Sequence, residues 1–166
     1  MPTNKSRRPR IAAAFLAGAV VCYFFLRPTP ESVMNDFYLN DAGRAEDMLM
    51  DPLILHTDLV KDRVIAEVVD RTIPKRLYAI GFLGVAGVTE ALPVLRTILA
   101  DESEEDTFRR VALTSIYQIS PEEGLTLAKQ YQARSDDLGS AAGEIVDGSA
   151  RIFTRTYWEA FWGRHH

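Results

Sequence analysis

Apolar residues recur every three or four positions along residues 74–132, which is the spacing of helices that pack on neighbours. The first run, residues 75–85, has an apolar face wide enough for a helix held between two others. Gly84 and Gly87 follow, and glycine permits the positive φ at which a chain leaves a helix. Thr89 is suited to cap a second helix. The pattern therefore predicts a buried helix, a turn and an amphipathic helix.

The same unit occurs a second time at a shift of 33 positions, which places Arg76 on Arg109. The matching positions are helix-spaced and mostly apolar: Ala79 with Ala112, Ile80 with Leu113, Leu83 with Ile116, Ala86 with Ile119 and Leu92 with Leu125. Two units in register predict a stacked helical solenoid. Residues 58–71 fit the shift less well and are interpreted as a degenerate preceding unit.

The stretch resembles the HEAT-like helical repeat, the variety also found in phycobilin lyases. The resemblance covers 59 of the 166 residues. Two features depart from the family's pattern: Gly87 is followed by Val88 instead of an acid, and Ser120-Pro121 replaces the glycine turn in the second unit. The residues that carry the resemblance are Arg76, Ala79, Leu83-Gly84, Gly87, Glu90-Ala91-Leu92-Pro93-Val94-Leu95, Leu99, Asp101, Arg109, Ala112-Leu113 and Ile116.

The resemblance implies an all-α fold, a short α-solenoid of HEAT-like helical hairpins. It implies several kinds of function, because such repeats occur in scaffolds, adaptors and regulatory subunits as well as in a few lyases.

The N-terminus contains an uncharged apolar run of sixteen residues, from Ile11 to Leu26, between a basic segment and Arg27-Pro28. Sixteen is slightly short of the roughly 20 residues of a membrane span, although arginines at both ends can extend it. The run predicts an uncleaved transmembrane signal anchor at residues 11–27, with residues 1–10 in the cytoplasm by the positive-inside rule. The domain of residues 28–166 would then be periplasmic or extracellular. A cleaved signal peptide and a soluble protein with a buried helix are the alternatives.

Charge separates the two parts of the chain. Residues 28–166 hold fourteen basic and 23 acidic residues, a net charge of −9. An acidic surface is unsuited to nucleic acid, whose phosphates need neutralising, so we expect no nucleic-acid partner. The single cysteine, Cys22, lies within the apolar run and excludes an intramolecular disulfide.

Further helices are expected on both sides of the repeats. Thr29-Pro30-Glu31 begins a helix to about Leu39, whose apolar stripe either seals the stack or lies near the membrane surface. Residues 41–50 predict a second helix that is broken at Asp51-Pro52. Asp58 is expected to cap a helix that runs to about Arg71, and a short helix is expected around residues 140–146.

The densest charge run, residues 101–106, is one candidate for binding a basic protein partner, through Asp101, Glu102, Glu104 and Glu105. A calcium loop is not indicated, since the run has no glycine. The structural alternative is a solvated loop whose last acids favour the N-terminus of a helix that begins near Thr107.

The tail, residues 150–162, is the second candidate and predicts a helix with an aromatic face. The face consists of Phe153, Tyr157, Trp158, Phe161 and Trp162. It could pack on the last repeat, bind a partner protein, or lie at a membrane interface, which tryptophan and tyrosine favour. Arg155 and Glu159 are spaced for an i,i+4 ion pair.

Catalytic constellations are not indicated. His56 is the one histidine before the C-terminal pair, with no nucleophile or metal-ligand spacing around it. We therefore expect no enzyme, cofactor or metal, but a membrane-tethered scaffold or adaptor that binds another protein. The alternative is a lyase-like enzyme or chromophore-attachment factor on the same repeats, with Arg76, Arg109 and Tyr78 as its candidate residues.

Overall fold

A computed structural model describes residues 27–39 and 44–163, with only the backbone of Asp47. Every regular element in these ranges is helical, which confirms the all-α class for this part of the chain. The helices are α2 (Pro30–Leu39), α3 (Asp51–Leu55), α4 (Thr57–Glu67), α5 (Arg76–Val85), α6 (Leu92–Ala100), α7 (Asp106–Ile119), α8 (Pro121–Tyr131), α9 (Asp137–Asp147) and α10 (Tyr157–Gly163), with 3-10 turns at Glu46–Met48 and Thr89–Ala91.

Residues 11–26 of the predicted anchor lie outside the described residues. Among the helices that are described, none is both long enough and apolar enough to cross a membrane.

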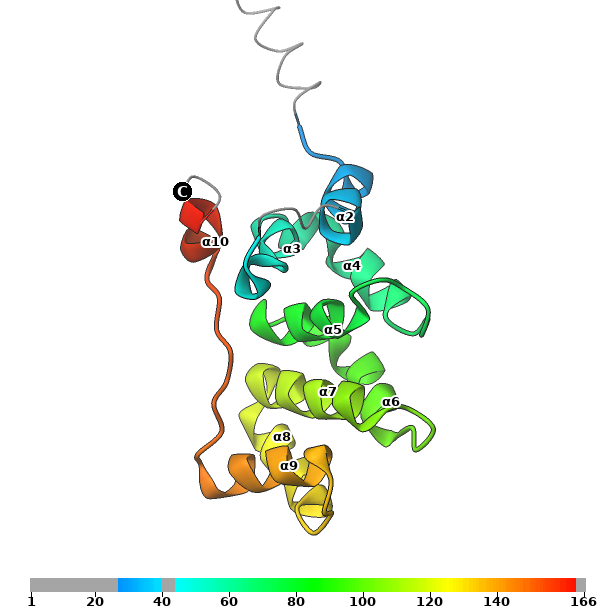
Figure 1. The fold of residues 1–166 in the computed structure, drawn as a ribbon, viewed down its shortest axis with the longest axis vertical. Coiled ribbons are helices and arrows are strands. Elements are labelled where there is room, and N and C mark those ends of the chain that lie inside the picture. Colours follow the sequence, from blue (N-terminus) through cyan, green and yellow to red (C-terminus); the bar gives the residue numbers. More distant parts are fainter. Residues whose placement is uncertain (1–26, 40–43, 164–166) are drawn as a thin grey trace, which may run out of the picture.

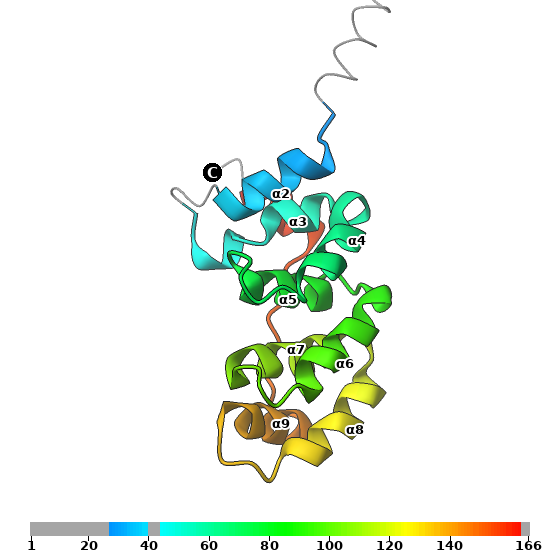
Figure 2. The same cartoon turned by 90° about the vertical axis from the view of Figure 1, so that its right-hand side faces the viewer.

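The helices are stacked in two layers (Figures 1 and 2). One layer contains α3, α5, α7 and α9, and the other contains α4, α6 and α8. The central helix is α7, which packs against α5, α6, α8 and α9. Successive helices therefore alternate between layers, an arrangement compatible with an α-solenoid.

Burial follows the 33-residue shift. Ala79, Ile80 and Leu83 of α5 are fully buried, and so are their counterparts in α7: Ala112, Leu113 and Ile116. The shared arginines are also buried, Arg76 at 4% and Arg109 at 3% exposure. Equivalent positions in the two units thus enter the same core, which confirms the predicted register.

Two glycines near the end of α5 have different roles. Gly87 has a φ of +65° and allows the chain to leave the helix, as predicted. The prediction for Gly84 is wrong, because it lies inside α5 against α7. A Cβ on Gly84 would lie 2.6 Å from the Cα of Ser115, so this glycine allows the two backbones to approach closely. The predicted Thr89 cap is also wrong, since its side chain makes no capping bond.

The N-terminal elements agree with the prediction in part. Helix α2 has the predicted bounds, and its stripe of Val33, Met34 and Phe37 is buried, so it seals the stack. Of the predicted helix at 41–50, residues 41–43 lie outside the described ranges, and the rest contains only a 3-10 turn. Proline begins α3 instead of breaking a helix, because first-turn amides need no intrahelical partner.

Helix α4 differs from its prediction at both ends. It begins at Thr57, so Asp58 lies in its first turn and does not cap it, and it ends at Glu67, before the expected Arg71. The buried face consists of Val60 and Val64, with Val68 just beyond the last turn.

The C-terminal part differs most from the prediction. Helix α9 is longer than expected, with Asp136 as its N-cap and Gly148 leaving it at a φ of +77°. Residues 149–156, the strap, contain no helix and run back along the stack from α9 past α7 and α5 towards α3 (Figure 1). Helix α10 follows and packs against α3. The predicted helix at 150–162 is therefore wrong before Tyr157, and so is its packing on the last repeat.

Candidate functional site

A buried ion pair fixes the end of the strap. The Nε and Nη2 atoms of Arg155 donate to Oδ1 and Oδ2 of Asp51, both at 2.8 Å. The two side chains are 12% and 2% exposed, so the pair is held mostly away from water. Arg155 is thus paired with Asp51, a partner that the expected i,i+4 pair with Glu159 does not include. The bidentate geometry ties residue 155 to the first turn of α3.

Two further hydrogen-bonded contacts hold the strap and α10. The side-chain amide of Gln118 on α7 donates to the carbonyl of Phe153 at 2.8 Å. At the start of α10, the carboxylate of Glu159 accepts from the backbone amide of Thr156 at 2.7 Å and from its hydroxyl at 2.8 Å. These two hydrogen bonds hold the pKa of Glu159 below its usual range, and the one from the backbone amide has the larger effect. The strap is thus attached at its middle and at its end.

Two adjoining cavities lie beside the strap. The larger, of about 460 Å³, is lined by Glu46, Met50, Tyr78 and Phe153. The smaller, of about 220 Å³, extends between α5 and α7 beneath residues 151–153. Met50, Tyr78 and Phe153 line both, so the two form one largely apolar concavity.

Tyr78, which lines both cavities, provides one polar group of this concavity. Its hydroxyl donates to Oε1 of Glu46 at 2.6 Å. This hydrogen bond, followed by burial and the charge of Glu46, raises the pKa of Tyr78. The phenol therefore remains protonated at neutral pH and acts as a hydrogen-bond donor. The concavity thus combines largely apolar walls with the carboxylate of Glu46 in the larger cavity and with Arg110 and Arg151 at the smaller one.

The predicted aromatic face is divided between two places. Phe153 lies in the strap and lines the concavity, whereas the other four aromatics lie on α10. Tyr157, Trp158 and Trp162 are 49%, 64% and 57% exposed, and Phe161 is partly buried. Their rings contact one another, with centroids 5.4 Å apart for Tyr157 and Trp158 and 5.3 Å for Phe161 and Trp162. The α10 aromatics are thus largely uncovered.

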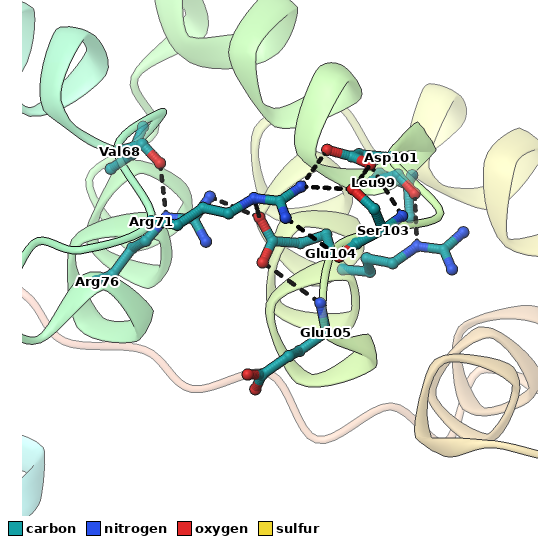
Figure 3. Close-up of polar contacts among 9 residues, drawn as sticks. Val68, Arg71, Arg76, Leu99, Asp101, Ser103, Glu104 and Glu105 are labelled. Carbon is teal, nitrogen blue, oxygen red and sulfur yellow. Dashed lines mark hydrogen bonds and ion pairs between the residues drawn. The ribbon is translucent and has the colours of Figure 1, made fainter.

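The acidic run is used mainly within the molecule (Figure 3). Glu104 is 5% exposed at its side chain and pairs with Nη2 of Arg76 at 2.8 Å and with Nε of Arg71 at 3.4 Å. Asp101 pairs with Arg71 and accepts hydrogen bonds from the amide and the hydroxyl of Ser103. These contacts lower the pKa of Asp101, and the bonds from Ser103 contribute most. Glu102 and Glu105 face solvent. The solvated-loop alternative is therefore wrong for Glu104, which joins two hairpins.

The two repeat arginines have equivalent contacts. Nε of Arg76 donates to the carbonyl of Val68 at 2.7 Å, and Nε of Arg109 donates to the carbonyl of Leu99 at 2.9 Å. Each therefore satisfies a carbonyl at the end of the preceding helix. Of the three residues expected for a lyase-like site, Tyr78 lines the concavity, and both arginines lie between helices.

Within residues 27–39 and 44–163, no group of three or more His, Cys, Asp or Glu side chains could hold a metal ion.

The sequence prediction missed Glu46, Met50, Asp51 and Arg155. Asp51 and Pro52 were interpreted only as a helix break. An aspartate beside the apolar residues 52–55 could have indicated a buried carboxylate that needs a cationic partner. Nothing local indicates that this partner is Arg155, 104 positions away.

Comparison of the chain with family models, with curated proteins and with solved structures found no match. The similarity to HEAT-like repeats thus stays a prediction that rests on the residues named above, and the fold and the site geometry are what bear on function.

Proposed function

We propose that this protein is a membrane-tethered adaptor, a short α-solenoid of HEAT-like hairpins, that binds an extended segment of another protein. The observation that carries the proposal is the concavity between Met50, Tyr78 and Phe153. Methionine and aromatic side chains in a concave site suit large apolar side chains of a partner. The strap lies across the same face as an extended chain, so the face can accommodate that conformation.

At the Glu46 side of the concavity, away from the smaller cavity that Arg110 and Arg151 line, charge favours a partner segment with a basic residue next to its apolar one. Glu46 lines the concavity, and residues 28–166 have a net charge of −9. The negative charge of the domain would attract a basic segment from a distance, and the bound segment could pair with Glu46. In this proposal Glu102 and Glu105 add to the negative electrostatic potential that attracts the segment, and Glu104 acts only as a structural ion-pair partner.

Site-specific photocrosslinking tests the binding role. The full-length protein would carry benzoylphenylalanine in place of Phe153, in membranes of the cells that produce it. The matched control carries the same group at Gln130, an exposed position on α8 in the other layer. A third protein adds Gly81→Leu to the Phe153 probe, because Gly81 lines the smaller cavity without close contacts and leucine would fill it.

We expect a discrete adduct from position 153 that is absent from position 130 and is lost with Gly81→Leu. The same adducts at both positions, or an adduct that is unaffected by filling the cavity, would overturn the binding role.

The tether is tested separately, through its topology. A reporter that is active only outside the cytoplasm, fused after His166, should be active and should remain with membranes after alkaline extraction. The expectation follows from the apolar run of residues 11–26 and the basic residues before it. Reporter activity confined to the cytoplasm contradicts the orientation, and release by alkaline extraction contradicts the anchor.

A lyase-like enzyme or chromophore-attachment factor is the second candidate. The larger cavity, about 460 Å³, is within the roughly 300–1,000 Å³ typical of small-molecule sites. Against this function, the raised pKa of Tyr78 makes its phenol a poor nucleophile, and Arg76 and Arg109 are engaged between helices. A change in absorbance of an added bilin with the native protein, but not with Gly81→Leu, would favour this candidate.

A further inference from the structure

We propose that α10 is a membrane-interface element, whose exposed aromatic face lies in the headgroup layer of the bilayer that holds the N-terminal apolar run. The proposal rests on the tether in the proposed function and is independent of the partner-binding concavity. It assigns Tyr157, Trp158 and Trp162 a lipid contact instead of a protein contact.

Large apolar side chains are exposed at one end of the stack. Figure 1 shows α2 and α10 on opposite sides of α3, at the same end of the stack, where the described chain begins. Leu39, the last residue of α2, is 76% exposed, and Trp158 and Trp162 on α10 are 64% and 57% exposed. Tryptophan and tyrosine favour the interface between hydrocarbon and water, because their rings are apolar with one polar group.

The start of the described chain lies beside α10. Arg27, Pro28 and Tyr157 line one cavity of about 490 Å³, together with residues 54–59. The apolar run ends at Leu26, one residue before Arg27. A headgroup layer is about 5–8 Å thick on each side of the hydrocarbon core. A run that is embedded in the bilayer therefore brings Arg27, and with it the first turn of α10, to the level of the headgroups.

The orientation of the aromatic face is set by contacts within the protein. Ala160 is fully buried, and the Arg155–Asp51 pair holds the chain just before α10. The hydrogen bonds between Thr156 and Glu159 fix its first turn. Because α10 is ordered before it meets lipid, little conformational entropy remains to be lost on contact.

Charge indicates which lipid headgroups this end can take. Glu31, Asp58 and Glu159 are exposed on α2, α4 and α10, so the surface is not a basic patch for anionic lipid. The contact is therefore driven by the aromatic rings, and zwitterionic phosphatidylcholine suffices for it.

Tryptophan fluorescence tests the proposal directly, because the chain contains two tryptophans and both lie on α10. The full-length protein would be reconstituted into vesicles of phosphatidylcholine, with or without bromine on the acyl chains close to the headgroups. Acrylamide in the water phase serves as the opposite quencher. Trp158→Phe and Trp162→Phe then report each position alone, and phenylalanine keeps an aromatic ring at these two side chains, which are more than half exposed.

We expect the protein to float with the vesicles and to lose most of its tryptophan emission with the brominated lipid, with little quenching by acrylamide. Added anionic lipid should not change the result. Flotation with quenching by acrylamide alone overturns the proposal while the tether stands. Flotation without quenching by either agent also overturns it, because the rings are then covered by protein. Failure to float overturns both this proposal and the tether.

Discussion

The contacts of Arg76 connect α5 to the end of α4, to the loop before α7 and to α7 itself. Its Nε donates to Val68, its Nη2 pairs with Glu104, and its guanidinium lies 4.8 Å from the ring centre of Phe108. Arg109 repeats part of this pattern with Leu99 and the ring of Tyr131. The buried positive charge of Arg76 is stabilised by the hydrogen bond of Nε and by the carboxylate at Nη2, while its Nη1 has no hydrogen-bond partner among the described residues.

Removing the charge of Glu104 should strongly destabilise the protein. Glu104→Gln leaves the guanidinium of Arg76 buried without its carboxylate, which costs about 3–5 kcal/mol for pairs of this kind. Glu105→Gln, at the exposed neighbouring acid, should cost less than about 0.5 kcal/mol. Urea unfolding followed by circular dichroism measures both. Equal losses in the two variants would contradict the role given to the buried pair.

Two glycines on α5 make a matched pair for testing the contact with α7. Gly84→Ala should destabilise by about 1–3 kcal/mol, because its Cβ would lie 2.6 Å from a backbone atom of Ser115. Gly81→Ala should stabilise by up to about 1 kcal/mol, since its Cβ would meet only side chains at 3.7 Å and alanine favours helix. Thermal unfolding of both proteins gives the comparison. Changes in stability of the same sign in the two variants would contradict the close approach of α5 and α7 at Gly84.

At the scale of elements, the ends of the helices depend on short-range polar contacts. Asp136 accepts from the amide of Gly139 at 2.9 Å and from Nε of Arg134 at 2.7 Å, which makes it the N-cap of α9. These contacts, the bond with Arg134 first, lower the pKa of Asp136 to about 2. The carboxylate of Asp136 therefore stabilises the folded state at pH values above its unfolded pKa of about 3.9. This stabilisation is lost as the pH falls towards 2.

The pH dependence of Asp136→Asn should reveal this cap. Asparagine can still accept from Gly139 but cannot pair with the charge of Arg134. We expect the native protein to be more stable than the variant above about pH 4, and the difference to vanish near pH 2. Unfolding in urea across this range measures it, and a carboxyl NMR titration locates the midpoint directly. A midpoint near the unfolded value would show that the cap does not form in solution.

The sequence predicted helix type well and helix ends poorly. The helical spacing of apolar residues was enough to predict α5, α7 and α8. Residues with this spacing, such as Leu83 and Ile116, lie on the buried face of their helix. Helix α9 was underestimated, because its buried face includes the small residues Ala141 and Ala142, which give a weak signal. The strap could not be predicted, since its residues have helical spacing and the contacts that hold it come from the distant Asp51 and Gln118.

At the scale of the whole molecule, the strap connects the two ends of the stack. Arg155→Ala should release α10 from α3, because it leaves the carboxylate of Asp51 buried without a partner. A loss of about 3–5 kcal/mol corresponds to amide exchange in α10 that is faster by at least on the order of a hundredfold. Arg151→Ala, an exposed arginine of the same strap, is the matched control. If the amides of α10 are equally protected from hydrogen exchange in both variants, the anchoring role of Arg155 is contradicted.

The closure between residues 51 and 155 also determines when the protein can finish folding during its synthesis. Open repeat arrays can fold unit by unit as they are made, since each unit contacts only its neighbours. Here Asp51 emerges 104 residues before the arginine that neutralises it. At about 5–20 residues per second, that interval is roughly 5–20 s. For that time α3 lacks α10, so α3 is made early among the described helices and acquires its last neighbour late.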